Sequence, residues 1–405
     1  MEKVLITWSK WKTSMTMLLD SLINNSLVVN SEFLRIKEKN KQKYFKSGRE
    51  LLKIYNAIPS WTPFKFLILQ DFFSFNYYIA ETDISNAFSQ IPWTSLWTKT
   101  IDIGILTNIF PEHIDGKLIK SFDELIEKKL YLLFWSTHYK KDKITKLIIN
   151  VNDKKIYKKL LEFIEKYKDK NFKIYLLVDK NLYLKIDKKL FEEVLFYDND
   201  IFWENSIKDY KLSFNWYYKP ASSILSILYF FKKINNLETN LKNISFPRWL
   251  WRMDLVEKNW NLFLIDHISE KNSFEWLINL LEKVYYNKNI ELIFSLKYDA
   301  SDSKIDDFAN LFEDLLNKWV IKKIYLYDNL QVRWVNDITT RNWEYKSFDL
   351  VRKLKWKIKN KNIEILENRD EKIKELILQK NKNKLFIISL NSIESPYFKK
   401  EFNLF

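Results

Sequence analysis

The sequence predicts a two-domain α/β protein whose sheets are mostly parallel. Short apolar strands alternate with amphipathic helices along the whole chain, a pattern typical of helices packed on parallel sheets. With 405 residues, 47% of them hydrophobic, the chain is long enough to bury two or three cores. An Asn-rich stretch ending in Ser245-Phe246-Pro247 interrupts the alternation, which then resumes. We therefore expect one domain over residues 1–243 and a second over residues 244–405.

Buried strands and helical spacing of apolar residues define the elements of the first domain. The expected strands are Val4–Thr7, Tyr77–Glu81, Ile103–Asn108, Lys146–Asn150 and Phe172–Val178. The expected helices are Lys12–Asn24, Phe122–Phe134 and Ala221–Lys233. Residues 33–75 are less regular and rich in aromatic side chains, so we expect an insertion or flap there.

The second domain repeats the same alternation on a smaller scale. Its expected strands are Leu262–Asp266, Ile290–Phe294, Lys323–Tyr327, Ile363–Leu366 and Lys384–Ser389. Helices are expected at roughly 272–286, 304–317, 346–357 and 370–380. No internal repeat and no long disordered tract is evident.

Charge and composition exclude several classes of protein. The formal charge is +15, but lysine is spread along the chain without a basic stripe or a nucleic-acid-binding motif, so no nucleic acid is expected. A basic surface does favour an anionic substrate. There is no cysteine, hence no disulfide framework and no thiolate metal site. The longest apolar runs, such as Ile224–Phe231, are too short to span a membrane, and the N-terminus enters a strand without a signal peptide. We expect a soluble cytoplasmic protein.

Glycine and tryptophan occur in abnormal numbers. The chain has 3 Gly and 16 Trp, whereas glycine ordinarily makes up roughly 7% of residues. Several tryptophans occupy positions where a backbone with positive φ is expected. Asn259-Trp260 resembles an Asn-Gly hairpin turn, and Trp319 follows a predicted helix as a C-cap glycine would. We hypothesise that these tryptophans stand for glycine, because UGA encodes glycine in some bacterial lineages and a reading of that codon as tryptophan would produce this pattern. The alternative is a naturally Trp-rich protein.

A candidate phosphate-binding loop lies at the N-terminus. Residues 4–14 read Val-Leu-Ile-Thr-Trp-Ser-Lys-Trp-Lys-Thr-Ser, and with glycine at positions 8 and 11 they become a strand, a phosphate loop and a helix start. Backbone N–H groups of such a loop bind phosphate oxygens, aided by the helix dipole. Lys12 would then reach the β- and γ-phosphates, and the Thr13 hydroxyl would hold Mg²⁺. As written, the side chains of Trp8 and Trp11 would obstruct phosphate. The predicted nucleotide contacts are Thr7, Trp8, Ser9, Lys10, Trp11, Lys12, Thr13 and Ser14.

This loop resembles the phosphate loop of the Mur ligases and of their relatives, the folylpolyglutamate and poly-γ-glutamate synthases. Three further stretches match in the family's order. Ile103–Asp115 is similar to the family's Thr-Asn-Ile…Asp-His-Leu-Asp signature, Ile148–Asp153 to its Asn-x-Asp-Asp strand end, and Arg248–Asp254 to its Gly-Arg-Met-Glu motif. The resemblance runs from residue 1 to about 390, with gaps around 33–75. It implies a central P-loop ATPase domain with a mostly parallel sheet, followed by a smaller Rossmann-like domain.

The resemblance also implies an activity, its cofactors and the roles of particular residues. The activity is an ADP-forming ligase that uses ATP and Mg²⁺ to join a carboxylate-bearing substrate to an amino acid. Glu81 and His113 would bind Mg²⁺ together with Thr13. Many family members carry a carbamylated lysine about 15 residues after that histidine, which places it at Lys129 or, one residue earlier, at Lys128. The residues implied to catalyse are Lys12, Lys129 and His113, and those implied to approach ATP from elsewhere are Asn215, Arg252 and Asp266.

The chain departs from the family pattern at three places. Ser269 stands where a histidine is common, and Leu390-Asn391-Ser392 lacks the usual Gly-Lys-Gly. The phosphate loop starts at residue 7, which leaves no N-terminal domain for a UDP-sugar. This favours an arrangement like that of the folylpolyglutamate or poly-γ-glutamate synthases, or a partner protein that supplies the missing part. Two other functions stay open: a P-loop ATPase or kinase of another kind, and a non-catalytic homologue that acts as a binding or scaffold protein.

Overall fold

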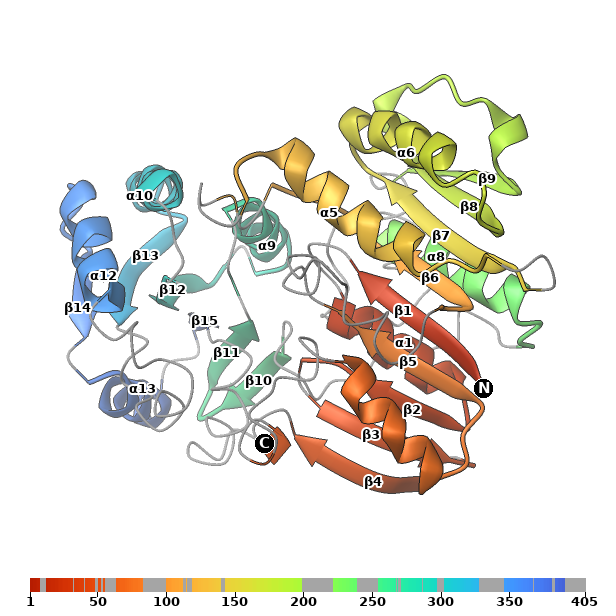
Figure 1. The fold of residues 1–405 in the computed structure, drawn as a ribbon. Coiled ribbons are helices and arrows are strands. Elements are labelled where there is room, and N and C mark those ends of the chain that lie inside the picture. The colour runs from red at the N-terminus through yellow and green to blue at the C-terminus, as the bar shows by residue number, and fades with distance from the viewer. Residues whose placement is uncertain are drawn as a thin grey trace. The chain divides into compact units, whose positions relative to one another are not determined.

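In a computed structural model the chain forms two compact units (Figure 1). The first contains the elements from β1 (Glu2–Thr7) to α8 (Ala221–Ile234), and the second those from β10 (Asp254–Lys258) to β15 (Lys384–Ser389). The structure describes residues 1–7, 12–31, 33–39, 41–47, 50–51, 54, 63–82, 100–111, 114, 119–139, 143–198, 221–238, 254–266, 268, 271–285, 287–296, 302–327, 346–366, 368–380 and 383–389. Within these ranges no helix combines the length and the apolar character needed to cross a membrane.

The first unit is built on a nine-stranded sheet with the order β4-β3-β2-β5-β1-β6-β7-β8-β9. Strands β2 to β9 are Ser26–Val29, Phe33–Glu38, Lys41–Ser47, Tyr77–Glu81, Ile103–Leu106, Thr145–Val151, Phe172–Asp179 and Glu193–Tyr197. From β2 to β9 in this order, all neighbouring strands pair in parallel. β1 therefore lies at the centre, between β5 and β6, and every strand predicted for this unit is confirmed.

The expectation of an insertion or flap at residues 33–75 is wrong for the part that the structure describes. β3 and β4 form an antiparallel hairpin that extends the sheet beyond β2. Phe33, Leu34 and Ile36 are buried in β3, whereas the first three residues of the edge strand β4 are exposed and carry two lysines. Charged residues on an edge strand prevent further pairing. The exposed, lysine-containing start of β4 gave the segment its irregular appearance in the sequence.

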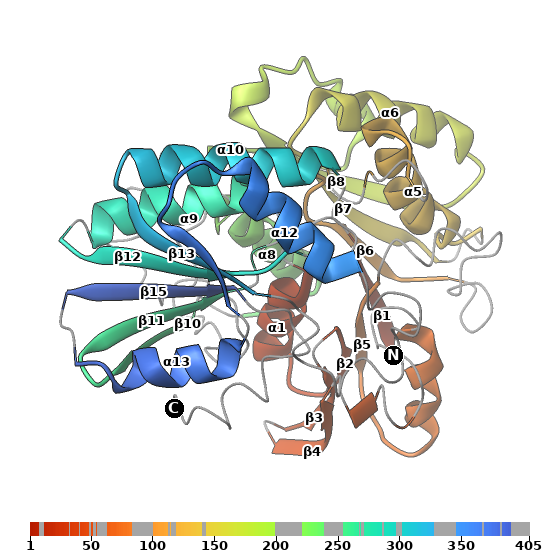
Figure 2. The same cartoon turned by 90° about the vertical axis from the view of Figure 1, so that its left-hand side faces the viewer.

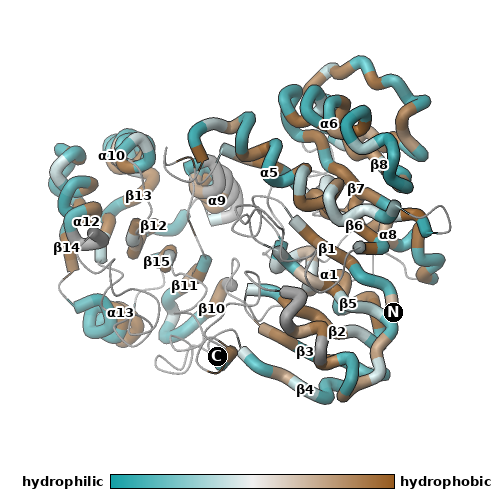
Figure 3. The backbone as a smooth tube through the Cα atoms, viewed as in Figure 1, coloured by the Kyte–Doolittle hydropathy of each residue, from teal (hydrophilic) through white to brown (hydrophobic). Residues whose placement is uncertain are grey.

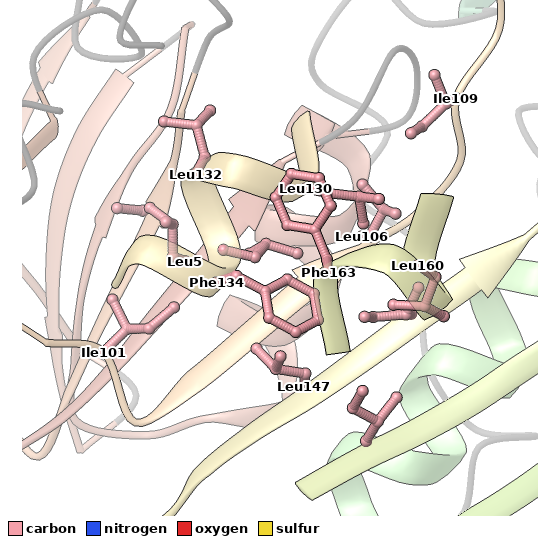
Figure 4. Packing of buried hydrophobic residues seen from close by; sticks show 14 of the residues in the cluster. Leu5, Ile101, Leu106, Ile109, Leu130, Leu132, Phe134, Leu147, Leu160 and Phe163 are labelled. Carbon is pink, nitrogen blue, oxygen red and sulfur yellow. The ribbon is translucent and has the colours of Figure 1, made fainter. Parts of the chain in front are cut away.

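Helices cover both faces of the first sheet. Figure 1 shows α5 (Phe122–Trp135) and α6 (Lys154–Lys166) over one face and α1 (Lys12–Leu22) with α8 over the other. In the core on the α5 side, Phe134 packs at ring distances of 5.6 Å from Phe163 and 5.1 Å from Phe172 (Figure 4). Three short helices lie in the connections from β4 to β5 and from β8 to β9: η1 (Pro63–Asp71), η2 (Lys180–Leu182) and η3 (Lys188–Leu190).

The second unit contains a six-stranded sheet with the order β10-β11-β15-β12-β13-β14. Strands β11 to β14 are Asn261–Asp266, Asn289–Phe294, Ile321–Tyr327 and Ile363–Leu366; the helices are α9 (Lys271–Val284), α10 (Asp302–Asn317), α12 (Lys346–Lys357) and α13 (Arg369–Leu378). All pairs are parallel except β10 with β11. Figure 2 shows α9, α10 and α12 on one face of this sheet and α13 on the other, as in a Rossmann-like fold.

Hydropathy follows this layered arrangement. Figure 3 shows mostly hydrophobic strands at the centre of each unit, whereas helices such as α6 alternate between hydrophilic and hydrophobic residues. A parallel strand that is covered on both faces needs a continuous apolar run, and a covering helix needs an apolar stripe. These two patterns are the ones from which the elements were predicted.

Two of the tryptophans that the sequence places in glycine positions have a left-handed backbone. In the two-residue loop between β10 and β11, Asn259 has φ 50° and Trp260 has φ 70°, the combination of a type I′ hairpin turn. Trp319 has φ 60°. Its N–H donates to the Leu316 carbonyl at 3.1 Å, and the N–H of Val320 donates to the Leu315 carbonyl at 3.0 Å, which is the Schellman motif that ends α10. The turn and the helix end predicted at these positions are confirmed.

Candidate active site

The carboxyl ends of the central strands of the first sheet bring polar residues to one edge. β1 ends at Thr7 and β5 ends at Glu81, which lies opposite Ile6 in the parallel register. On the other side of β1, Leu106 at the end of β6 lies opposite Thr7. Ligands of open α/β sheets bind outside this edge, so the site is built where the fold predicts it.

Three predicted residues meet at this edge. The Thr13 hydroxyl donates a hydrogen bond of 2.8 Å to Oε2 of Glu81, and Nζ of Lys12 lies 3.8 Å from Oε1 of the same carboxylate. The Glu81 side chain is completely buried, whereas 22% of the Lys12 side chain is exposed. Lys12 and Thr13 are the first two residues of α1, at its positive end. A buried anion is thus held by a hydroxyl and a cation that follow directly on the candidate phosphate loop.

Two residues that sequence reasoning missed complete this cluster. The hydroxyl of Ser31 lies 3.1 Å from that of Thr13, and Nδ2 of Asn30 donates to the Thr16 hydroxyl at 3.0 Å. Asn30 and Ser31 follow β2, which pairs in parallel with β5. A polar pair directly after a buried run, Ser26–Val29, is the sequence signal that would have indicated them.

The donor set of this cluster fits a hard divalent cation. Mg²⁺ takes oxygen ligands and uses only one or two carboxylates alongside water and phosphate. Here the buried Glu81 carboxylate and the hydroxyls of Thr13 and Ser31 supply oxygen atoms. Among the residues whose placement is described, no three His, Cys, Asp or Glu side chains gather into a metal-binding group. Any cation here would therefore depend on hydroxyl and phosphate oxygens as well as on Glu81.

Burial distinguishes the two lysines that the family pattern left open. Lys129 on α5 is 1% exposed, among the largest fully buried side chains of the described residues, whereas Lys128 is half-buried. A lysine is almost never fully buried unless its charge is compensated or its amine is used. Of the two lysines, Lys129 alone is fully buried.

The motif at the end of β7 has a clear local function. Asp153 is the N-cap of α6 and accepts a hydrogen bond of 2.8 Å from the backbone N–H of Lys155. Asn150 and Asn152 do not contact the Thr13 cluster in any described bond. They instead bind the backbone that follows β6, at Thr107 and Ile109.

The remaining predicted residues fall into two groups. Thr7 is buried at the end of β1, Ser14 is half-buried on α1, and Asp266 is buried at the end of β11 in the second unit, opposite Ser389 of β15. Those that lie outside the described residues are Trp8, Ser9, Lys10, Trp11, His113, Asn215, Arg252 and Ser269. Their predicted roles stay predictions.

Several solved structures with this architecture are ligases. One is a MurF ligase from Thermotoga maritima in complex with ADP, with a TM-score of 0.57 at 15% sequence identity. The match covers 99% of this chain and 80% of the MurF chain. This chain has the fold of the Mur ligases. Structures of E. coli FolC with DHPP and ADP (TM-score 0.59, 10% identity) and of Helicobacter pylori folylpolyglutamate synthetase (0.54, 16%) share it. Each covers 99% of this chain, and this chain covers 88% and 89% of theirs.

The Mur ligase fold confirms the predicted fold class: a large, mostly parallel sheet followed by a smaller Rossmann-like unit. A scan against family profiles and a search of curated proteins both find no match to the sequence.

Proposed function

We propose that this protein is an ATP-dependent ligase that joins a carboxylic acid to an amino acid through an amide bond. The single observation that carries this proposal is the hydrogen bond between Thr13 and the buried Glu81, beside Lys12. These residues come from two segments that are distant in sequence, belong to the motifs that resemble those of the Mur ligases, and meet where the fold binds nucleotides. The Mur ligase fold supports the same activity.

The proposed reaction has two steps. A carboxylate oxygen of the acid attacks the γ-phosphorus of ATP, the bond from that phosphorus to the β,γ-bridging oxygen breaks, and an acyl phosphate and ADP result. The amine of an amino acid then attacks the acyl carbon, loses a proton and expels phosphate. Neither step needs covalent chemistry from the protein, so positioning and charge stabilisation do most of the work.

Lys12 supplies the principal positive charge. Its ammonium group is partly exposed beside Glu81 and lies at the first residue of α1, so its charge adds to the positive end of the helix. Both act on the negative charge that spreads over the transferring phosphoryl group. Glu81 holds Lys12 in place in the absence of nucleotide.

Magnesium fits the same cluster. Thr13 and Glu81 would hold it, with Ser31 adjacent and His113 as the predicted further ligand. The ion would neutralise charge on the phosphate oxygens. Lys129 is proposed as the carbamylated residue: its ammonium group would lose a proton, and the neutral amine would add to carbon dioxide and lose a second proton, which converts a buried cation into an anion. Its 1% exposure supports this assignment over Lys128.

The substrates follow from the proposed chemistry. The acid bears a carboxylate, and the amine belongs to an amino acid. Asp266, with Arg252 and Asn215, is proposed to contact ATP. The chain covers 88–90% of the FolC-type structures and 76–80% of the MurF structures, which favours acids of the folate or γ-glutamyl type for the first trials. ATP and free amino acids are cytoplasmic, which supports the same location for the protein.

Release of ADP in the presence of Mg²⁺ tests this function. A variant with glycine at positions 8 and 11 is mixed with ATP, a panel of folate-type and γ-glutamyl acids, and amino acids. A ligase releases ADP in proportion to the amide formed, and only when an acid and an amine are both present. ADP release that does not depend on the amino acid indicates another P-loop ATPase. Tight ATP binding without any turnover indicates a scaffold protein.

A further inference from the structure

The backbone that follows β6 is held by two asparagine side chains from the end of β7. Oδ1 of Asn152 accepts from the Ile109 N–H at 3.0 Å, and its Nδ2 donates to the Ile109 carbonyl at 2.9 Å. The amide thus binds both polar groups of one residue, as a neighbouring strand would. It does so three residues after β6 ends at Leu106.

Asn150 binds the same segment two residues earlier. Its Nδ2 donates to the carbonyl of Thr107, and its Oδ1 accepts from the Tyr197 hydroxyl at 2.8 Å. All three residues are buried. Burial raises the pKa of Tyr197 far above its usual value, so the hydroxyl keeps the proton that it donates. A polar chain therefore connects the end of β9, through the end of β7, to the segment after β6.

This segment borders the proposed active site. The N–H of Thr107 donates to the Thr7 carbonyl at 3.4 Å, at the start of the candidate phosphate loop. Asn108, between the two fixed residues, is 2% exposed. Four residues after Ile109 the chain reaches His113, the predicted metal ligand.

We propose that Asn150 and Asn152 are positioning residues of the active site, which set the backbone of residues 107–109 beside the start of the candidate phosphate loop. This inference rests on the proposed function. The proposal explains why both residues are asparagine. Each side-chain amide donates to a backbone carbonyl through Nδ2 and accepts a hydrogen bond at Oδ1. An aspartate of the same shape cannot donate while it is ionised, and it would set two oxygens against each other.

The substitution Asn152→Asp, made in the variant with glycine at positions 8 and 11, tests the proposal. We expect kcat to fall at least about tenfold, as a small misplacement of catalytic groups does, and the Mg²⁺ concentration for half-maximal activity to rise. The loss should shrink as the pH is lowered toward 5, because protonation of the introduced carboxylate restores a donor at position 152. Tyr197→Phe, which keeps the core volume, should give a smaller loss in the same direction.

Asn171→Asp is the matched control. Nδ2 of Asn171 also donates to a backbone carbonyl, that of Lys143 at 2.9 Å, but at the opposite edge of the sheet, before β8. It should leave the Mg²⁺ requirement unchanged. The proposal is overturned if Asn152→Asp has parental kcat and Mg²⁺ dependence, or if Asn171→Asp reproduces its kinetic and pH effects. Absence of ADP release from the parent itself would instead refute the proposed function.

A second and independent inference concerns the tryptophans with a left-handed backbone. Trp260 and Trp319 have φ of 70° and 60°, in two motifs that favour glycine, and their side chains are 53% and 64% exposed. A left-handed backbone is costly for a bulky residue, and exposure means that little packing compensates for it. Trp356, by contrast, is helical in α12 and 88% exposed. We infer that positions 260 and 319 are glycine in the protein that the source cell makes.

Stability and mass test this second inference. Trp260→Gly and Trp319→Gly should each raise the melting temperature by about 2–4 °C, whereas Trp356→Gly should lower it because glycine weakens a helix. Peptides from the native protein should have the masses of glycine at both positions. Tryptophan in those peptides, or no gain in melting temperature for either variant, overturns the inference.

Discussion

The hydroxyl of Thr13 lies 2.8 Å from Oε2 of Glu81, although 68 positions separate the two residues in sequence. The parallel pairing of β1 with β5 brings them together, because it places Glu81 beside the strand that leads into α1. One residue thus follows the candidate phosphate loop, and the other ends the neighbouring strand.

Glu81→Gln should abolish most of the ligase activity. The change keeps the shape of the side chain but removes the negative charge that faces Lys12 and Thr13. The substitution is made in the variant with glycine at positions 8 and 11. We expect kcat, measured as ADP release at saturating Mg²⁺, to fall by about 100-fold or more relative to that variant. Glu50→Gln, at an exposed glutamate of the same unit, is the control. Activity within twofold of the parent in both variants would remove Glu81 from the site.

Lys129→Met should reduce activity much more than Lys128→Met. Lys129 is 1% exposed and Lys128 is half-buried, so the two substitutions compare a fully buried amine, the proposed site of carbamylation, with a partly exposed one next to it. We expect a loss of at least about 100-fold for Lys129→Met. The parent should lose activity in buffers freed of carbon dioxide and regain it with bicarbonate. Equal activity of the two variants would argue against a role for Lys129.

Lys170 should make stability rise with pH. Burial lowers its pKa to about 8, while Nζ donates at 3.0 Å to the Phe134 carbonyl at the end of α5. Between pH 8 and the model-peptide value of about 10.4 the unfolded chain binds more protons at this lysine than the folded chain does, so the free energy of unfolding increases with pH. Lys170→Met should remove this rise in urea titrations, and exposed Lys158→Met should not. If the free energy of unfolding of Lys170→Met keeps the same pH dependence as the parent, Lys170 is not the source of the rise.

Gly104→Ala should destabilise the first unit. A Cβ at position 104 in β6 would lie 2.7 Å from Cδ2 of Leu147 and 3.0 Å from Cδ2 of Leu133, both buried. Overpacking of this kind costs about 1–3 kcal/mol. The free energy of unfolding from urea titration would show it. No loss of stability would mean that the two leucine side chains shift to make room for the added methyl group.

Much of the fold follows from local sequence. The buried strands, such as Ile103–Leu106, are continuous apolar runs, and the helices show apolar spacing, so both are visible without the structure. The hairpin β3–β4 was missed because β4 is an edge strand without a buried residue, and it carries several lysines. The hairpin joins the sheet through the pairing of β3 with β2. The residues of the hairpin alone do not indicate this pairing.

Only part of the site was predicted, because some of its contacts join segments that are distant in sequence. Lys12, Thr13 and Glu81 were found because they lie in motifs. Ser31 and the asparagine bonds to residues 107–109 depend on strands that lie side by side but are distant in sequence, and no local pattern indicates such contacts. Tyr197 is the extreme case, since it reaches Asn150 from 47 residues away in sequence.

Calorimetric titration of Mg-ATP tests the central claim most directly. It is performed on the protein as written, on the variant with Trp8→Gly and Trp11→Gly, and on that variant with Glu81→Gln added. Saturable binding to the double-glycine variant is expected, with weaker binding once Glu81→Gln is present and none to the protein as written. Absence of binding in all three would contradict the nucleotide site and, with it, the proposed ligase.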